Sequence, residues 1–121
     1  MQTAASLLTA LTALLHVGFL VLEMFLWTKP VGRKVFRNSP EKAEITRVLA
    51  ANQGLYNGFL AAGLCWSLVH PDPAFALQLK VFFLVCVVAA AIYGAWTVSP
   101  RILLVQGGPA LLALLFVFLG M

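Results

Sequence analysis

The fold of this chain is decided by its first apolar stretch, TAASLLTALTALLHVGFLVLEMFLWT, residues 3–28. The stretch is longer than the ~20 residues that a helix needs to cross ~30 Å of hydrocarbon. Its only charged residue is Glu23. A carboxylate at that depth costs a few kcal/mol on insertion scales unless it is protonated, partnered or facing a polar cavity. The stretch therefore predicts a membrane-spanning helix, and Glu23 is a candidate functional residue.

Three more apolar stretches follow along the chain. Of the 121 residues 62% are hydrophobic and 10% are charged, whereas an average soluble domain is about 25% charged. The runs are continuously apolar rather than alternating, which favours helices over strands. The sequence predicts a single all-α domain, residues 1–121, built as a four-transmembrane-helix antiparallel bundle. The predicted helices cover about residues 3–28, 40–69, 75–98 and 101–120.

Two serines that precede prolines mark helix starts. Ser39 stands before Pro40, and Ser99 stands before Pro100. A serine hydroxyl accepts a hydrogen bond from a free N–H of the first turn, and proline is favoured at the first helical position. We expect these serines to cap the second and fourth predicted helices.

The basic residues predict the orientation of the chain. The formal net charge is +4, and six of the eight Lys and Arg residues lie in the loop between the first two predicted helices or at the start of the second helix, within residues 29–47. Cytoplasmic loops carry such an excess of positive charge. We therefore expect this loop to be cytoplasmic and both termini to be extracytoplasmic. Arg101 falls on the cytoplasmic side, and only Lys80 falls toward the other side.

Part of the basic loop has the pattern of a segment that lies on a membrane surface. Val31, Val35 and Phe36 alternate with bases in this part. Apolar side chains of such a segment enter the headgroup region, while its bases contact anionic lipid. Membrane lipid is therefore an expected partner, and nucleic acid is not predicted for so short a patch. The predicted headgroup contacts are Arg33, Lys34 and Arg37.

Counting depth along antiparallel helices places polar side chains at two levels. Glu23 lies about five residues from the inner end of its helix, and polar residues of the other three helices lie about equally far from theirs. At ~1.5 Å per residue this layer lies ~7–8 Å below the interface. His16 is on the same helix face ~10 Å deeper, and Asn57 falls near its level. The inner layer comprises Glu23, Asn52, Gln53, Tyr93 and Gln106. For both Glu23 and His16, the alternative is a purely structural hydrogen bond to a neighbour.

The second predicted helix carries a stripe of small residues. Ala50, Gly54, Gly58 and Ala62 recur every four residues. Small residues at this spacing allow the backbones of two helices to approach closely. We expect this stripe to contact another helix, and the Gly54/Gly58 face offers an interface for a homodimer. Packing alone is the alternative.

The fourth predicted helix is interrupted by the sequence Gln106-Gly107-Gly108-Pro109. Pro109 cannot donate a hydrogen bond to the carbonyl of Val105, so we expect a kink with a partly free carbonyl. The kink either lines the polar pocket around Glu23 or serves packing only.

The chain resembles a bacterial family of small four-span membrane proteins catalogued as domain of unknown function 1304. The similar segments, about half of the chain, are LHVGFLVLEMFLWTKPVGRKVF (residues 15–36), LAANQGLYNGFLAAGL (49–64) and IYGAWTVSPRILLVQGGPALLALL (92–115). The resemblance implies a multi-pass protein of the bacterial inner (cytoplasmic) membrane and brings no established reaction or ligand. The family's pattern falls on His16, Glu23, Asn52, Gln53, Tyr56, Asn57 and Gln106.

Three functions remain open from the sequence. In the first, the protein is a proton-coupled transporter of a small cationic or lipophilic solute, and Glu23 exchanges a proton for the solute. In the second, it is a membrane-embedded module that binds lipid, quinone or haem, or an enzyme, which uses His16 and Glu23. In the third, it is an accessory subunit of a membrane complex.

Enzyme activity is the weaker prediction, and the sequence names no catalytic residue and no cofactor. No metal site is predicted, because one His and one Glu ~10 Å apart on a helix cannot share an ion.

Overall fold

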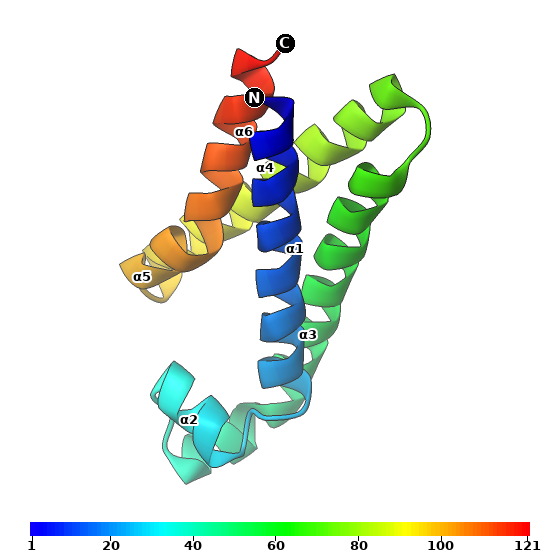
Figure 1. The fold of residues 1–121 in the computed structure, drawn as a ribbon. Helices are drawn as coiled ribbons and strands as arrows, with labels where there is room; N and C mark the ends of the chain where they lie inside the picture. Colours follow the sequence, from blue (N-terminus) through cyan, green and yellow to red (C-terminus); the bar gives the residue numbers. More distant parts are fainter. The chain divides into compact units, whose positions relative to one another are not determined.

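All regular structure in this chain is helical (Figure 1). The computed structural model describes residues 1–121. The predicted all-α class is confirmed, and there are no strands. In chain order the elements are α1 (Gln2–Met24), α2 (Pro30–Phe36), α3 (Pro40–Val69), α4 (Pro73–Thr97), α5 (Pro100–Ile102), the π-helical turn η1 (Leu103–Gly107) and α6 (Gly108–Leu119).

The chain packs as two compact units. Unit 1 comprises Met1–Leu15 and Leu60–Met121, and unit 2 comprises His16–Phe59. Helices α1 and α3 each contribute residues to both units. Because these helices are continuous, the division does not test the predicted single domain, which stays a prediction.

Unit 1 has a core of small and branched apolar side chains from α1, α3, α4 and α6. Gly63 of α3 packs directly on the ring of Phe83 of α4, where a Cβ would overlap the ring. Figure 1 shows α6 running beside the first half of α1, with both chain ends at one end of this unit. A Cβ added at Gly120 would lie 3.4 Å from the Cβ of Met1. The buried core residues are Ala13, Leu64, Leu84, Val87, Ala110, Ala113 and Leu114.

Three helical segments are long and apolar enough to cross a membrane by length and composition. They are Gln2–Met24, Pro73–Thr97 and Pro100–Leu119, the last of which runs through α5, η1 and α6. Helix α3 has 30 residues and carries three side-chain amides and several charged residues in its first turns, so it is less apolar than the other long helices. The fourth predicted span stays a prediction.

The first helix ends four residues earlier than predicted, at Met24 rather than Thr28. The chain turns after Met24, where the amide of Leu26 bonds to the oxygen of Val21 over 3.2 Å instead of continuing the α-helical pattern. Helix α2 then starts at Pro30 and packs its Gly32 on the backbone of Leu26, where any side chain would clash. The early end therefore follows from the return of α2 onto the turn, which residue patterns within the first helix do not reveal.

The predicted interruption of the last helix is confirmed, in the form of a π-helical turn. Residues Leu103–Gly107 form η1, and Pro109 stands in the first turn of α6. Such turns occur where a helix must accommodate a missing hydrogen bond or a close contact. Gly107 makes that contact, because a Cβ there would lie 2.9 Å from the Cβ of Ala91 in α4.

Candidate functional site

In unit 2, α1 and α3 approach each other closely along a glycine face. Gly54 is buried, and a Cβ added there would lie 2.7 Å from Cγ of Met24 and 3.2 Å from the backbone oxygen of Leu20. A Cβ at Gly58 would lie 2.6 Å from Cδ1 of Leu20. The expected contact of this stripe with another helix is confirmed, and that helix is α1 of the same chain. A homodimer through the Gly54/Gly58 face stays a prediction, and it would require α1 to leave that face.

The glycine contact brings the amide of Asn57 onto the carboxyl of Glu23. Nδ2 of Asn57 donates a hydrogen bond to Oε1 of Glu23 over 2.6 Å. Glu23 is 6% exposed and Asn57 is 7% exposed. The ion pair that the structure contains is Arg47–Glu44, at the surface, so Glu23 is paired with no Lys or Arg. The site is therefore a buried carboxyl group with a neutral hydrogen-bond donor.

The sequence assigned the wrong level to Asn57, which it grouped with His16 rather than with Glu23. The depth count took Arg47 as the inner end of the second span, but α3 begins at Pro40, and the residue that meets Glu23 is Asn57. The count of about five residues from Arg47 was therefore short by more than one helical turn. Asn52, expected beside Glu23, is exposed and donates instead to the backbone oxygen of Val48 over 2.9 Å. Gln53 is also exposed.

A signal for Asn57 was present in the sequence. Ala50, Gly54, Asn57 and Ala61 are spaced by four, three and four residues, and all four are buried. This spacing marks one face of a helix that packs on a neighbour. The predicted stripe of small residues shares Ala50 and Gly54 with this buried face, but it does not include Asn57.

His16 is fully buried in α1, at 0% exposure. Its ring meets the ring of Phe19 edge-on, with centroids 5.5 Å apart and planes at 80°. The imidazole therefore packs on the Phe19 ring, seven residues before Glu23 and on the same face of α1.

The three remaining predicted residues are half-buried or exposed. Tyr56 is 61% exposed on α3. In unit 1, Tyr93 is 66% exposed on α4, and Gln106 is half-buried in η1. Their participation in one site with Glu23 stays a prediction. No group of three or more His, Cys, Asp or Glu side chains could hold a metal ion.

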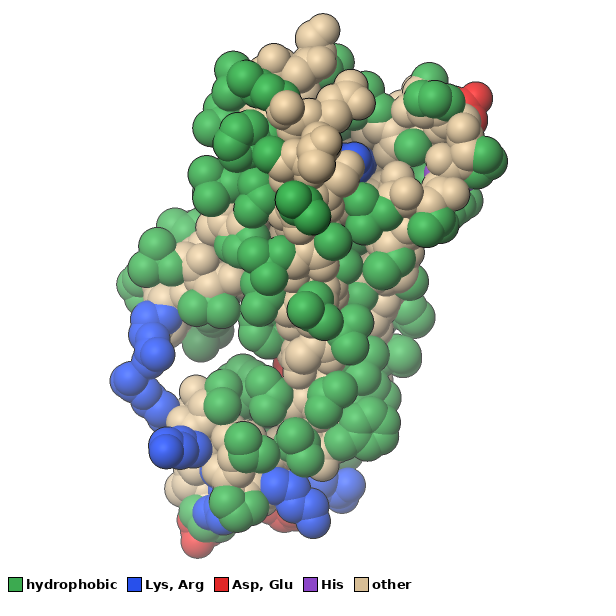
Figure 2. All heavy atoms as spheres, viewed as in Figure 1, with side chains coloured by type: hydrophobic (Ala, Val, Ile, Leu, Met, Phe, Trp, Pro, Cys, Tyr) green, Lys and Arg blue, Asp and Glu red, His purple; other side chains and the backbone are tan.

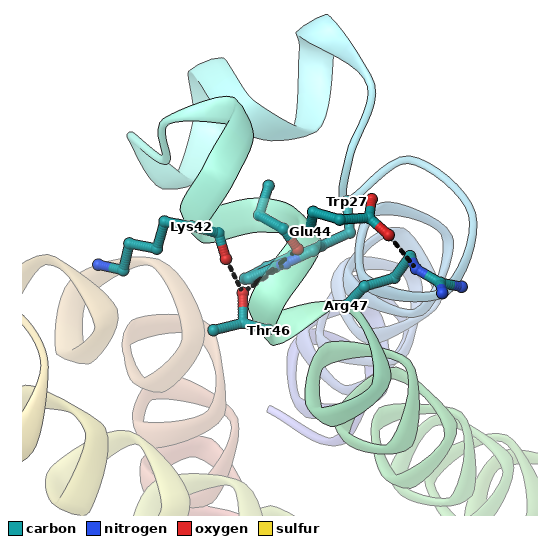
Figure 3. Close-up of polar contacts among 6 residues, drawn as sticks. Trp27, Lys42, Glu44, Thr46 and Arg47 are labelled. Carbon is teal, nitrogen blue, oxygen red and sulfur yellow. Dashed lines mark hydrogen bonds and ion pairs between the residues drawn. The ribbon is translucent and has the colours of Figure 1, made fainter.

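Helix α2 is held to the start of α3 by Trp27. Nε1 of Trp27 donates to the hydroxyl of Thr46 over 3.0 Å, and this hydroxyl donates to the backbone oxygen of Lys42 over 2.7 Å (Figure 3). The Trp27 ring also packs on Phe36, with centroids 4.7 Å apart. These contacts fix the position of α2 within unit 2.

The surface of α2 is mixed in character. Figure 2 shows Lys and Arg side chains gathered around α2 and the neighbouring start of α3, next to many hydrophobic side chains. Val31 is 49% exposed and Val35 is 52% exposed, one helical turn apart. The predicted interfacial segment is thus a short helix with an exposed apolar edge among the bases.

Sequence reasoning missed a second polar group, around Lys80 in unit 1. Nζ of Lys80 in α4 donates to the hydroxyl of Ser6 in α1 over 3.2 Å. The two side chains line an open pocket of about 660 Å³ at the end of unit 1 that carries the chain termini. The sequence signal was the single base on this side of an apolar helix, but its partner is 74 positions away in the chain.

Comparison with known proteins finds relatives of unassigned function. The uncharacterized protein YpaA of Lactococcus lactis subsp. lactis (strain IL1403) is 32% identical over 114 residues, which cover 93% of this chain and 94% of that protein. No solved structure matches the chain. The family model described as protein of unknown function (DUF1304) matches residues 10–118. With nearly the whole chain matched, the protein belongs to this family of unknown function.

Proposed function

We propose that this protein is a multi-pass membrane carrier that exchanges protons for a small cationic solute at Glu23 and Asn57. The observation that carries this proposal is the buried hydrogen bond from the Asn57 amide to the Glu23 carboxyl. A carboxyl group kept out of water between two helices is costly unless it has a use or a partner.

A neutral amide is a suitable partner for a carboxyl group that gains and loses a proton. The N–H of an amide can donate both to a carboxylate oxygen, where the bond is stronger, and to the carbonyl oxygen of a carboxylic acid. An ion pair with Lys or Arg would instead hold the carboxyl group in its charged form. The Asn57 bond therefore supports both states of Glu23, as an exchange site requires.

The absence of a basic partner also favours a cationic solute. Glu23 in its charged form has no Lys or Arg to compensate it. A proton or a bound cation supplies the missing charge, and buried charges in proteins are compensated in one of these ways. Proton and cation then compete for one carboxyl group, which couples their movements.

The membrane arrangement that we propose has four spans, with α3 as the fourth apolar helix, in the bacterial inner membrane. The concentration of bases around α2 supports a cytoplasmic position for this end of unit 2 and extracytoplasmic chain termini. The exposed edge of Val31 and Val35 supports a position of α2 in the headgroup layer. Arg33, Lys34 and Arg37 would then contact anionic lipid heads.

Flux through proteoliposomes tests the exchange. The full chain is reconstituted into liposomes that contain the pH dye pyranine, and ethidium or tetraphenylphosphonium is added outside under an acid-inside gradient. We expect cation entry to speed the loss of internal protons relative to empty liposomes. Glu23→Gln keeps the size of the side chain but cannot carry a proton, so the coupled flux should fall to the level of empty liposomes.

Glu44→Gln is the matched control, because Glu44 is exposed and pairs with Arg47 at the surface. Its flux should equal that of the wild type. Coupled flux that persists in Glu23→Gln, or wild-type flux no faster than that of empty liposomes with both cations, would contradict the proposal.

A further inference from the structure

The pocket at the terminal end of unit 1 is a second candidate binding site, independent of Glu23. Its volume of about 660 Å³ falls within the ~300–1,000 Å³ that is typical of small-molecule pockets. Segments of α1, α3, α4 and α6 line it. We propose that this pocket binds the anionic head of an amphiphile, a carboxylate or phosphate on an alkyl chain, with Lys80 as the counter-charge.

The polar lining of the pocket is rich in hydrogen-bond donors. Lys80 has three N–H donors, and its recorded hydrogen bond is to Ser6. Since the Ser6 hydroxyl accepts from Lys80, its own hydrogen is available to donate. The Gln2 amide adds further donors. A ligand with several acceptor oxygens matches such a lining best.

His70 adds an imidazole ring to the lining of the pocket. The backbone N–H of Asp72 donates to Nδ1 of His70 over 3.1 Å. Nδ1 also lies 3.3 Å from the backbone oxygen of Asp72, to which it would donate if it carried the hydrogen, so these contacts fit both tautomers. The ring is held in place by Phe75, whose centroid is 4.6 Å away.

No Asp or Glu side chain lines the pocket. The nearest acid along the chain, Asp72, is occupied as the N-cap of α4, where its Oδ1 accepts from the amide of Phe75 over 2.9 Å. No carboxylate lies within 4 Å of the Lys80 ammonium group. An anion would supply the counter-charge.

The rest of the lining is apolar. Leu68, Leu77 and Val117 face the same space. Lys80 lies seven residues into α4, ~10 Å from its first residue, a depth from which a long lysine side chain can reach the headgroup layer. A lysine at this level usually extends outward to the surface, whereas Lys80 reaches across to α1. An amphiphile would place its charged head at Lys80 and its chain along the apolar wall.

Native mass spectrometry of the purified full chain in an uncharged detergent tests this assignment. Hexadecanoate and hexadecanol have the same chain and differ in charge, and inorganic phosphate provides the charge without a chain. We expect hexadecanoate to bind about tenfold or more tighter than hexadecanol, as for a charge-assisted hydrogen bond. Phosphate that competes with hexadecanoate at equal concentration would identify a free anion, rather than a lipid head, as the source of the anionic group.

Variants of the pocket distinguish the contribution of the Lys80 charge to binding from that of the pocket volume. Lys80→Gln should weaken hexadecanoate about tenfold, to the level of hexadecanol, while Lys80→Arg should retain binding. The matched control is Lys42→Gln, an exposed lysine in unit 2, which should bind as the wild type does. Ala76→Phe fills the pocket with Lys80 intact and should weaken both ligands, so it tests the site even if Lys80→Gln does not fold.

Two results would overturn the assignment. One is equal affinity of the wild type for hexadecanoate and hexadecanol. The other is hexadecanoate affinity in Lys80→Gln or Ala76→Phe equal to that in Lys42→Gln. Glu23→Gln should bind hexadecanoate normally, so failure of the exchange proposal and failure of this one are distinguishable.

Discussion

Asn57 Nδ2 lies 2.6 Å from Glu23 Oε1, although 34 positions separate the two residues in the chain. The bond joins α1 to α3 at a close helix contact, where Gly54 has no side chain and there is no room for one. A carboxyl group with little exposure and a single neutral donor is sensitive to loss of that donor. The stability and the proposed exchange activity of the protein therefore depend on the same pair.

Removal of the Asn57 amide should destabilise the protein. Asn57→Ala leaves the buried carboxyl of Glu23 without its donor, at a cost of about 1–3 kcal/mol. Asn52→Ala removes an exposed amide that bonds only to its own helix, and should cost less than about 0.5 kcal/mol. Thermal unfolding in detergent compares the two. An equal decrease in stability in both variants would mean that the Asn57–Glu23 hydrogen bond does not stabilise the protein more than an exposed amide does.

Added methyl groups on the glycine face should separate α1 from α3. Gly54→Ala meets Cγ of Met24 and the backbone of Leu20, and overpacking of this kind costs about 1–3 kcal/mol. Gly58→Ala meets only the tip of the Leu20 side chain, which can move. Its cost should be smaller.

Gly18 in α1 provides the control for this series. A Cβ there meets nothing within 4 Å, and alanine stabilises helix interiors by about 0.5–1 kcal/mol relative to glycine. The midpoint of thermal unfolding should therefore be highest for Gly18→Ala, lower for Gly58→Ala and lowest for Gly54→Ala. A Gly54→Ala variant as stable as Gly18→Ala would refute the close contact.

Two adjacent glycines, Gly107 at the end of η1 and Gly108 at the start of α6, carry different expectations. Gly107→Ala should destabilise the protein, because its Cβ would lie 2.9 Å from the Cβ of buried Ala91. Gly108→Ala meets no atom within 4 Å beyond its chain neighbours, so its cost should be smaller and limited to placing a Cβ in helical backbone before Pro109. Differential scanning fluorimetry in detergent reads both midpoints. The reverse order would contradict the packing of η1 on α4.

Loss of the Thr46 hydroxyl should make local unfolding of α2 more frequent. Thr46→Val removes the acceptor for Trp27 Nε1, a loss of about 1 kcal/mol, so trypsin should cleave at the bases of α2 roughly fivefold faster. Thr97→Val removes a hydroxyl that bonds only to its own helix, at Tyr93. Its cleavage rate should match that of the wild type, and faster cleavage in both variants would point to general loosening instead.

Helix starts could be predicted from the sequence because they depend on adjacent residues. The amide of Lys42 donates to the hydroxyl of Ser39 over 3.1 Å, and the amide of Arg101 donates to that of Ser99 over 3.3 Å. Both predicted caps are confirmed. The capping groups lie within three positions of their partners, so no tertiary structure is needed to find them.

The partner of Glu23 could not be predicted by depth counting, because the count needs the position of α3 along α1 and the rotation of α3. Both are set where the two helices meet, at Gly54 and Gly58. The Lys80 pocket was hidden for a related reason. Its lining comes from four segments, and only the folded unit brings Ser6 to Lys80.

The most direct test of the exchange site is proton release when a cation binds. Tetraphenylphosphonium is added to the purified protein in weakly buffered detergent solution, and the pH change is recorded with a dye. The wild type and Glu44→Gln should release protons in proportion to the cation bound, and Glu23→Gln should release none. Equal proton release from Glu23→Gln and the wild type would contradict the assignment of Glu23 as the exchanging group.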